Sequence, residues 1–533
     1  MAAGAAPGLQ PHMCGHNPGG RRRRPRGHPF LRRHASGARP SGNEYFRHVR
    51  RVLAIAVLAL MAAGPAAAAG PTPPLTHEGR WITDARGRVV ILHGVNMVYK
   101  VPPYYPKAGG FGVDDARFLH RHGLDTVRLG VIYKGVEPKP PANGDPRYDD
   151  GYLRKLAKTE RLLGKHGIFS LVDFHQDLYN ERFQGEGWPD WQVEDDGAPN
   201  PQNGFPANYL TNEALNRAYD HFWNNDVVGG VKLQNEYARA WKHVAARFGR
   251  RPHVLGYDLL NEPWPGSVFP TCVDPAGCPA FDATTLTDFT KRTIAAIRKV
   301  DSSTLAFYEP LLTFDFGAQT SMGDTGDANA GFSFHDYCLD NSAPSCPTTE
   351  AVAFDNADAE AVKTDRALML TEFGATNDRP RIEHMVDLAD QHMVSWMWWA
   401  YCGCDDPTTS GPGNVQAIVK DPRKPPSGSN VLHRKLALLD RPYPQVVAGT
   451  PTSFGYDRDS GSFRFAYAAR TPAGKVLPRR SKTTVYVPRR HYPDGYRVRA
   501  AGAKVTSKPG ARYLVLERKK GVPHVTLTVT PRS

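Results

Sequence analysis

Eight short apolar runs alternate with helix-like segments between residues 89 and 401, and this alternation limits the fold more than any other feature of the chain. Each run is continuously apolar, which is typical of parallel strands that are covered on both faces. Eight strand–helix units predict an α/β fold, a (β/α)8 TIM barrel with enlarged loops. The predicted strands are Val89–Met97, Asp125–Ile132, Phe169–Asp177, Val254–Pro263, Leu305–Leu312, Gly331–Cys338, Ala367–Ala375 and Val394–Tyr401.

A doubly wound sheet would show the same alternation of strands and helices. Such a sheet carries a Gly-rich phosphate loop after its first strand, whereas this chain has only His93-Gly94-Val95-Asn96 there. The barrel is therefore the preferred interpretation. Its weakest repeat follows the fifth run, because residues 316–327 are rich in Gly and poorly helical. The predicted helices are Asp114–His122, Tyr148–His166, Asn212–Phe248, Thr284–Val300, Ala351–Asp365 and Pro380–His392.

The last part of the chain has a different pattern. From about residue 445, short segments alternate apolar and polar residues, most strictly in Val525–Thr530, and turn signals such as Pro493-Asp494-Gly495 separate them. The pattern predicts a small C-terminal antiparallel β-sandwich. We therefore expect three parts: a leader over residues 1–69, a catalytic barrel over residues 70–444 and the sandwich over residues 445–533.

Residues 1–69 are typical of a targeting segment. Three arginines precede the apolar run Val52–Ala63, and small residues ending in Ala67-Ala68-Ala69 follow it, as in a secretory signal peptide. The run is too short to span a membrane, which takes about 20 residues. We therefore expect a secreted, extracellular protein. A start codon assigned too far upstream and a disordered extension both explain the basic residues before Arg47, and Arg50-Arg51 leaves a twin-Arg signal open.

Composition matters mainly through the distribution of charge. The net charge of +14 comes from the two ends, because residues 1–69 carry 11 Lys and Arg against 1 acid and residues 445–533 carry 18 against 4. The block between them is acidic and would repel phosphates, so no nucleic-acid partner is expected. The basic C-terminal domain favours peripheral contact with lipid surfaces. Solvated Arg-rich strands are the alternative explanation.

Six cysteines remain when Cys14 is removed with the leader, and an even number fits export and disulfide formation. The simplest pairs are local, Cys272 with Cys278 and Cys338 with Cys346. Cys402 and Cys404 are too close in sequence for an easy bridge and are candidates for free thiols. None of the spacings resembles a zinc site. The sequence implies no metal, nucleotide or organic cofactor.

Polar or aromatic residues follow nearly every predicted strand, where the loops of a barrel build its active site. Two carboxylates stand out, Glu262 in Leu-Leu-Asn-Glu-Pro and Glu372 in Leu-Thr-Glu-Phe-Gly. Retaining glycoside hydrolysis uses such a pair about 5–5.5 Å apart. Either Glu alone could instead cap a helix or pair with Arg, so the prediction rests on the pair. The other candidates are Asn96, Lys100, Arg128, His175, Asp177, Asn261, His335, Tyr337 and Trp399.

In this order the residues resemble glycoside hydrolase family 5. The family pattern has Arg in the second strand, Asn-Glu after the fourth, His-x-Tyr after the sixth and Glu after the seventh. More narrowly, three segments resemble the endoglycoceramidases and the related endogalactosylceramidases. These segments are Gly94-Val95-Asn96-x-x-x-Lys100, Asp173-Phe174-His175-Gln176-Asp177 and Arg441-Pro442-Tyr443-Pro444.

The resemblance implies a role for each catalytic candidate. Glu262 would be the general acid/base and Glu372 the nucleophile. His335 and Tyr337 would surround the nucleophile, with Tyr337 donating a hydrogen bond that keeps Glu372 ionised. Arg128 would act on Glu372 electrostatically, and a structural ion pair is its alternative role.

Five further residues would bind the sugar. Asn261 would bind its 2-hydroxyl, a contact that strengthens in the transition state, unless it serves only the turn. Lys100 and Asp177 would grip the sugars on the non-reducing side, or form only a loop ion pair. Trp399 would be the sugar platform, although a misalignment by one residue is possible beside Trp396 and Trp398. His175 would line the site or serve as a core histidine.

The resemblance further implies a retaining endo-β-glycosidase that cleaves between the glycan and the ceramide of glycosphingolipids by double displacement. We expect the enzyme to be secreted, as its leader indicates, and monomeric. The substrate would be a glycolipid or an oligosaccharide. Alternatives in the same family are a β-glucanase or mannanase, and a glucosylceramide or steryl β-glucosidase. A non-catalytic sugar-binding barrel is a further alternative, against which the presence of both carboxylates argues.

Two more sequence features bear on the site. Glu309 in Phe-Tyr-Glu-Pro imitates the Asn-Glu-Pro motif without its Asn, so we expect a structural or substrate-lining role for it.

The long loop 179–209 could supply an apolar slot for the lipid chains, because long loops on barrel tops are usually functional. Its apolar candidates are Phe183, Trp188, Trp191 and Phe205.

Overall fold

The computed structural model describes residues 70–338, 343, 345–409 and 414–532. The predicted leader and Cys14 lie outside the described residues. Within the described ranges, none of the helices has both the length and the apolar character that crossing a membrane requires.

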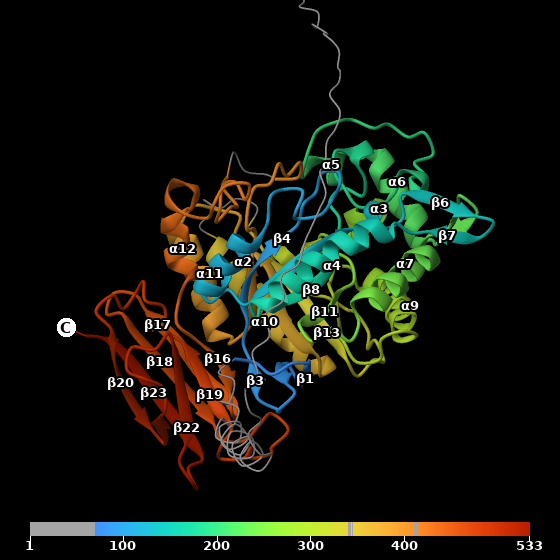
Figure 1. Cartoon of the computed structure of the whole chain (residues 1–533). Helices are drawn as coiled ribbons and strands as arrows, with labels where there is room; N and C mark the ends of the chain where they lie inside the picture. Colours follow the sequence, from blue (N-terminus) through green and yellow to red (C-terminus); the bar gives the residue numbers. More distant parts are fainter. Residues whose placement is uncertain (1–69, 339–342, 344, 410–413, 533) are drawn as a thin grey trace, which may run out of the picture. The chain divides into compact units, whose positions relative to one another are not determined.

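Eight parallel strands close into a barrel with helices around it, which confirms the predicted fold class (Figure 1). Each strand pairs with the next along the chain, and the last pairs with the first. Every predicted apolar run corresponds to one barrel strand, although the strand of the sixth run begins one residue before it, at Ala330. These strands are β4 (His93–Met97), β5 (Thr126–Ile132), β8 (Phe169–His175), β11 (Val254–Asp258), β12 (Leu305–Tyr308), β13 (Ala330–Asp336), β14 (Ala367–Phe373) and β15 (Ser395–Trp398).

The first predicted strand, Val89–Met97, divides between two sheets. Val89 and Val90 form β3 (Val89–Val90), which pairs antiparallel with β16 (Tyr443–Val447), and the barrel strand begins only at His93. The apolar run is continuous because it passes between two cores. Val89 belongs to the core of the C-terminal domain, whereas Val90 belongs to an apolar cluster formed mostly by side chains of the barrel strands.

The helices follow the predicted pattern with one correction. The segment Asn212–Phe248 forms two helices, because a hairpin of β9 (Val227–Val228) and β10 (Val231–Lys232) turns at Gly229-Gly230, where both φ values are positive. No helix forms within residues 317–329, as the Gly-rich composition predicts. The main helices are α2 (Val113–Arg121), α4 (Asp150–Lys165), α6 (Glu213–Trp223), α7 (Leu233–Phe248), α9 (Thr287–Arg298), α10 (Cys346–Thr364), α11 (Arg379–Gln391) and α12 (His433–Leu439).

Side-chain caps explain where three of these helices begin. Asp149, Asn212 and Asp378 accept hydrogen bonds from backbone N–H groups in the first turns of α4, α6 and α11. The loops carry shorter elements. These are α3 (Tyr133–Val136), β6 (Lys139–Ala142), β7 (Asp145–Arg147), η1 (Glu181–Phe183), η2 (Asp190–Gln192), α5 (Ala207–Thr211), η3 (Gly266–Thr271), α8 (Pro279–Phe281), η4 (Asp282–Leu286), η5 (Leu312–Phe316) and η6 (Gly428–Asn430).

The C-terminal part forms two antiparallel sheets over a shared core. One sheet has the order β17 (Thr450–Asp457), β18 (Ser462–Ala468), β23 (His524–Pro531) and β20 (Tyr496–Ala501). Alternate residues of β18 and β23 are buried, as the period-2 pattern predicts. The second sheet consists of β1 (Leu75–Glu78), β2 (Trp81–Asp84), β3, β16, β19 (Lys482–Tyr486), β22 (Tyr513–Arg518) and β21 (Ala503–Val505).

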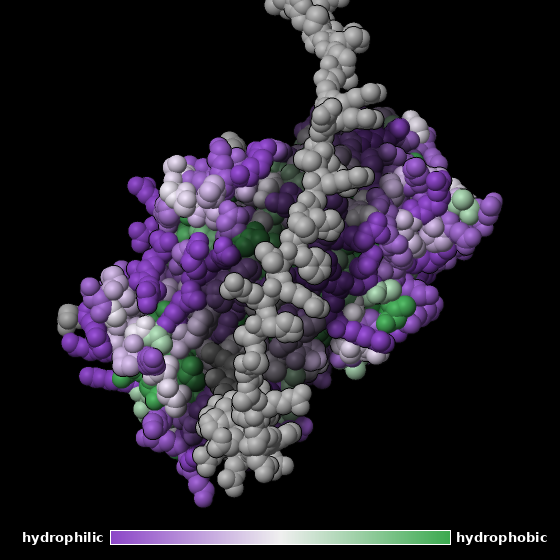
Figure 2. Space-filling view, in the orientation of Figure 1, coloured by the Kyte–Doolittle hydropathy of each residue, from purple (hydrophilic) through white to green (hydrophobic). Residues whose placement is uncertain are grey.

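The second sheet therefore begins with residues that we assigned to the barrel block. Strands β1 to β3 precede the barrel in the chain, yet β3 hydrogen-bonds to β16. The sequence pattern of such short strands does not show which sheet they join. The face in Figure 2 is mostly hydrophilic, with small, scattered apolar patches.

All three disulfides join cysteines that are close in sequence. The predicted pairs Cys272–Cys278 and Cys338–Cys346 are confirmed. Cys402 and Cys404 are also bridged, which corrects the expectation of free thiols. The positive φ of Cys404 turns the chain so that the two Cα atoms are 5.2 Å apart, a normal separation for a disulfide.

A buried ion pair joins the N-terminal strands to the C-terminal sheet. Arg88 Nε donates to Asp84 Oδ2 over 2.9 Å, and both side chains are almost fully buried. The same guanidinium donates to the carbonyl oxygens of Lys482 and Gly70. One cation thus joins the residues around Asp84 to Lys482, which lies 394 positions further along the chain than Arg88.

We expect Arg88→Met to lower the free energy of unfolding by about 3–5 kcal/mol, because it leaves the buried Asp84 carboxylate without a cation. Urea denaturation followed by circular dichroism measures this loss. Arg86→Met is the matched control, since Arg86 is exposed two residues away, and should change stability by less than about 0.5 kcal/mol. Equal stability of the two variants would show that the pair is dispensable.

Candidate active site

Glu262 and Glu372 lie at the carboxyl ends of barrel strands and line one cavity. Glu262 follows β11, and Glu372 is the penultimate residue of β14. His335, in β13, connects them, because its Nδ1 lies 2.9 Å from Glu262 Oε1 and 3.9 Å from Glu372 Oε2. Both carboxylates therefore approach the same imidazole nitrogen and face the same cavity.

The backbone of Glu262 is held in a sparsely populated conformation. Its φ is +42°, in the region that favours glycine, and such strain costs of order 1–3 kcal/mol. Its N–H donates to Glu309 Oε2 over 2.8 Å, and the amide of Gln176 donates to the carbonyl oxygens of Asn261 and Glu262. Glu309 therefore positions Glu262 through the backbone.

Glu372 is held by two donors. Arg128 Nη1 forms an ion pair with Oε1, and the Tyr337 hydroxyl donates to Oε2 over 3.0 Å, which is the contact expected for Tyr337. Burial raises the pKa of Glu372 to about 7, with His335 and Arg128 opposing the rise and Glu262 adding to it. The two donors favour the ionised form that a nucleophile requires.

Arg128 lies at the centre of the site and is fully buried. Its guanidinium forms ion pairs with acids from four strands or strand ends, and it also donates to Asn261 Oδ1 over 3.0 Å. Both roles considered for Arg128 therefore hold at once. Arg128 forms structural ion pairs inside the barrel, and it is also the cation beside Glu372. Its acidic partners are Asp173, Asp258, Glu309 and Glu372.

Two neighbouring residues are fixed by the same network. Asn261 Nδ2 donates to the carbonyl oxygen of Gln176, and its side chain still lines the cavity, so binding of a sugar hydroxyl stays a prediction. Asn96 donates from Nδ2 to the carbonyl oxygen of Thr371.

The pKa of His335 lies well above its ordinary value. Burial alone would lower this pKa, but the carboxylates of Glu309 and Glu372 raise it.

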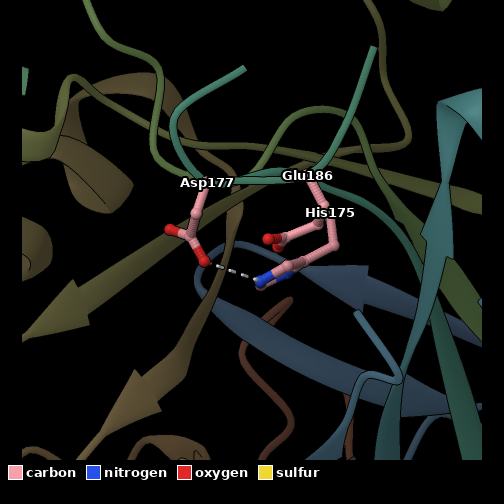
Figure 3. Close-up of side chains that lie close together, drawn as sticks. All are labelled: His175, Asp177 and Glu186. Carbon is pink, nitrogen blue, oxygen red and sulfur yellow. Dashed lines mark ion pairs between the residues drawn. The ribbon is translucent and has the colours of Figure 1, made fainter. Parts of the chain in front are cut away.

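A second charged cluster surrounds Lys100, whose ammonium pairs with Asp177 and lies 3.5 Å from Asp406 Oδ1. The same nitrogen lies 3.7 Å from Glu186 Oε1 and 4.5 Å from the centre of the Trp399 ring. Figure 3 shows the side chains of His175, Asp177 and Glu186 converging on one point. Of the predicted residues, Lys100 thus contacts both Asp177 and Trp399.

His175 joins this cluster to the catalytic one. Its Nδ1 lies 2.9 Å from Asp173 Oδ2, and its ring stacks on Trp399 with centroids 5.2 Å apart. Asp173 also pairs with Arg128. Burial would lower the pKa of His175, but the Asp173 carboxylate raises it to about 10. His175 is therefore a charged residue of the cavity wall.

The cavity has a volume of about 240 Å³ and two kinds of lining. One part is polar or charged and contains Lys100, His175, Asp177 and Thr408 with the Trp399 ring. Trp396 and Trp398 are fully buried, so Trp399 is the tryptophan that faces the cavity. The apolar part is lined by Phe205, Pro206, Tyr209, Leu312, Phe316 and Ala375.

Of the four apolar residues suggested in the loop 179–209, only Phe205 lines the cavity. Phe183 and Trp188 are buried in the core, where Trp188 stacks on Tyr179. The Trp191 indole donates to the carbonyl oxygen of Glu137, away from the cavity. These residues anchor the loop, because a long loop with its own buried aromatic side chains can be rigid.

Two groups of acidic and histidine side chains bring their donor atoms within 4.8 Å of one another, as metal ligands would. Protein cations already balance the carboxylates in both groups. Lys100 and His175 face Asp177 and Glu186, and His335 faces Glu262 and Asp315. The side chains in both groups therefore fit clusters of ion pairs between protein residues better than they fit metal sites.

Several residues of the site escaped sequence reasoning. Thr408 contacts both Lys100 and Asp177, and Glu186 and Asp406 complete the charge around Lys100. They lie on loops whose spacing carries no signal. Asp173 could have been found from the sequence. It lies two residues before His175 in the same strand, and alternate residues of a strand face the same side.

The comparisons with known proteins agree with this geometry. Residues 84–405 match the family model described as Cellulase (glycosyl hydrolase family 5), and residues 441–530 match the Glycoside hydrolase family 5 C-terminal domain. The chain belongs to glycoside hydrolase family 5. The first match covers the barrel strands and both carboxylates.

Relatives of this family 5 enzyme are similar over most of its length. Endoglycoceramidase I of Rhodococcus hoagii is 32% identical over 84% of this chain and 86% of its own, and an endoglycoceramidase of Hydra vulgaris is 28% identical over 85% and 88%. Endo-glycoceramidase II from Rhodococcus sp., solved as a lactosyl-enzyme intermediate, is 27% identical with a TM-score of 0.68, covering 84% of this chain and 99% of that one. The chain is a retaining glycoside hydrolase.

Replacing either carboxylate should stop turnover without unfolding the enzyme. We expect Glu262→Gln and Glu372→Gln each to lower kcat for an aryl β-lactoside by at least about 100-fold, because each removes one partner of the double displacement. Initial rates measure this effect, and circular dichroism checks the fold. Glu383→Gln, on the outer helix α11, is the control and should keep full activity. Near-normal turnover of either site variant would contradict the assignment.

Removing the Tyr337 hydroxyl should move the acid limb of the pH profile. Tyr337→Phe takes a donor from the ionised form of Glu372, so the pKa of Glu372 rises and the acid limb of kcat/KM moves to higher pH by about one unit. Tyr308→Phe in β12 is the control, because its hydroxyl lies near Glu360 rather than near the site. An acid limb that stays in place would mean that Tyr337 does not control ionisation of the nucleophile.

Proposed function

We propose that this family 5 enzyme hydrolyses the β-linkage between the glycan and the ceramide of glycosphingolipids. The observation that carries the proposal is the divided cavity. A charged wall suits a hydroxyl-rich glycan, and an apolar wall suits a ceramide, while Glu262 and Glu372 line the same space. Cleavage by double displacement would then release an intact glycan and free ceramide.

The charged wall supports recognition of sugars on the non-reducing side. Lys100 presents a cation, Asp177 presents an acceptor, and Trp399 offers an aromatic face, which are the groups that bind sugar hydroxyls and the apolar face of a pyranose ring. Although burial would raise it, Lys100 and His175 hold the pKa of Asp177 well below its ordinary value. The acceptor therefore stays ionised wherever the enzyme is active.

The apolar wall supports a lipid on the other side of the scissile bond. Phe205, Leu312 and Phe316 line the cavity and are partly exposed, so covering them with a hydrocarbon chain gains about 25 cal/mol for each Å² removed from water. A glucanase or mannanase would bind a further sugar here. The apolar lining favours a lipid over a further sugar.

The relatives support the same substrate class. Endo-glycoceramidase II from Rhodococcus sp. was solved in complex with ganglioside GM3, and this complex is 26% identical to the chain with a TM-score of 0.67. Glucosylceramidases of fungi match only about a third of the chain. Full-length similarity to endoglycoceramidases favours cleavage beside ceramide over removal of a single glucose.

Three further properties belong to this proposal. Export is supported by the signal-like residues 47–69 and by three disulfides, which persist in oxidising compartments. Contact of the basic C-terminal domain with anionic lipid surfaces is supported by its 18 Lys and Arg against 4 acids. A monomer is proposed, because one chain supplies both carboxylates and both cavity walls.

Incubation of the purified enzyme with GM3 in detergent micelles should release sialyllactose and ceramide in equal amounts, detected by mass spectrometry. Glu372→Gln should release neither. Detection of free monosaccharide alone, or of cellulose and mannan hydrolysis without action on any glycolipid, would overturn the proposal.

A second arm tests the apolar wall. Phe316→Ser should lower kcat/KM for lactosylceramide about tenfold or more, because it removes apolar surface that the ceramide would cover, while an aryl β-lactoside is cleaved as before. Val362→Ser, at an exposed position on α10, is the matched control. Equal losses on both substrates would mean that Phe316 supports the fold rather than the lipid.

A further inference from the structure

A second cavity adjoins the charged wall of the active site. Its volume is about 350 Å³, and neither Glu262 nor Glu372 lines it. The loops that follow β4 and β15 form it, and these two strands are neighbours in the barrel. Because the parallel strands of a barrel all end at one rim, this cavity lies at the same rim as the active site.

Asp406 and Thr409 connect the two cavities. Thr409 lines both of them. Asp406 Oδ1 lies 3.5 Å from Lys100 Nζ and accepts a hydrogen bond from the Thr408 hydroxyl, which is the side of the active site. Asp406 Oδ2 accepts a hydrogen bond from Gln416 Nε2 over 2.9 Å, in the lining of the second cavity. The charged wall of the active site therefore continues into the second cavity.

Gln416 gives the second cavity a buried polar group in a fixed orientation. Its side chain is 1% exposed, donates to Asp406 and accepts from the Thr409 hydroxyl. Its carbonyl oxygen accepts a hydrogen bond from the Trp398 indole over 2.8 Å, so the backbone is fixed as well. A polar group that is already ordered loses little freedom when a ligand binds beside it.

Tyr99 adds an aromatic ring to the same lining. The side chain is partly exposed, and Gly109 packs against the ring so closely that a Cβ atom at residue 109 would lie 2.7 Å from two ring carbons. The glycine thus lets the loop after β4 hold the ring in place. Aromatic rings bind the apolar face of a pyranose, and polar groups beside them bind its hydroxyls.

The charges of the lining favour an uncharged ligand. The carboxylates of Asp405, Asp406 and Asp421 line the cavity, against the two cations Lys420 and Arg423. Arg423 Nε already pairs with Asp421 Oδ1 over 2.8 Å. An anionic ligand would therefore meet more negative than positive charge. Neutral sugars fit this lining, because their hydroxyls both donate and accept hydrogen bonds.

We propose that the second cavity is a distal glycan subsite that binds the outer, neutral sugars of glycans longer than a disaccharide. Sugars near the scissile bond would lie against Lys100, Asp177 and Trp399, and the chain would continue past Thr409 into the second cavity. The inference rests on the sugar-binding role proposed for the charged wall, and it does not require ceramide on the other side of the bond.

The test uses soluble 4-methylumbelliferyl β-glycosides that share one aglycone and differ in the glycan. The reference is the lactoside. Two probes carry one further galactose on the outer ring, at O3 or at O4, and a third carries sialic acid at O3. With the wild-type enzyme we expect kcat/KM for the better galactosyl probe to exceed that for the lactoside about fivefold or more, because contacts with remote sugars contribute to the rate. The sialyl probe should stay within about twofold of the lactoside.

Tyr99→Ala should lower kcat/KM for the better galactosyl probe about three- to tenfold, which is the effect of losing one aromatic contact. The lactoside should stay within about twofold, because it does not reach the second cavity. Tyr105→Ala is the matched control, since Tyr105 is also partly exposed, contacts Lys155 and lines neither cavity. Asn414→Trp is a second variant at an exposed position of the lining. It fills the cavity without removing a packed side chain and should abolish the advantage of the longer glycan.

Two results would overturn the proposal. One is equal kcat/KM for the lactoside and both galactosyl probes in the wild-type enzyme, and the other is an equal loss on short and long glycans in both variants. A gain from sialic acid as large as that from galactose at O3 would overturn the assignment to neutral sugars. Because no probe contains ceramide, failure of the distal subsite is distinguishable from failure of the proposed lipid substrate, which the glycolipid assay measures.

Discussion

The site depends on one buried cation. Arg128 comes from β5, and its guanidinium pairs with carboxylates that come from or follow β8, β11, β12 and β14. A buried charge is expensive unless its partners satisfy it, so these acids and Arg128 require one another. The consequence is positional. Arg128 fixes Glu372 directly and fixes Glu309, which in turn accepts the backbone N–H of Glu262. Both candidate catalytic carboxylates are therefore oriented by the same cation.

Much of the fold follows from periodicity, because a barrel strand must be apolar on both faces. The eight runs therefore contain the eight barrel strands, and residues after them converge. Boundaries failed where one run serves two cores, as at Val89–Val90, and where a Gly-Gly hairpin interrupts a helical pattern. The prediction of free thiols at Cys402 and Cys404 was wrong, because residue spacing does not show the backbone turn that brings the two cysteines together.

The candidate site was predictable where chemistry is tied to a strand end. Glu262, Glu372, Arg128, His335 and Tyr337 meet because the strands that carry or precede them belong to one closed parallel barrel, whose strands all point their carboxyl ends to the same rim. Residues such as Asp315, Glu186 and Thr408 lie on loops, and their partners are distant in sequence. A carboxylate on a loop has no periodic neighbour, so only the folded chain shows which charge it faces.

The charge balance also explains how one glutamate can serve two steps. Under the proposed assignment, Glu372 becomes an ester to the sugar and loses its negative charge, whereas Arg128 still faces Asp173, Asp258 and Glu309. The cation therefore remains paired while the repulsion that Glu372 exerts on Glu262 disappears. The site around Glu262 is then less negative in the second step, in which Glu262 has to accept a proton from water. The same network thus supports the acid in the first step and the base in the second.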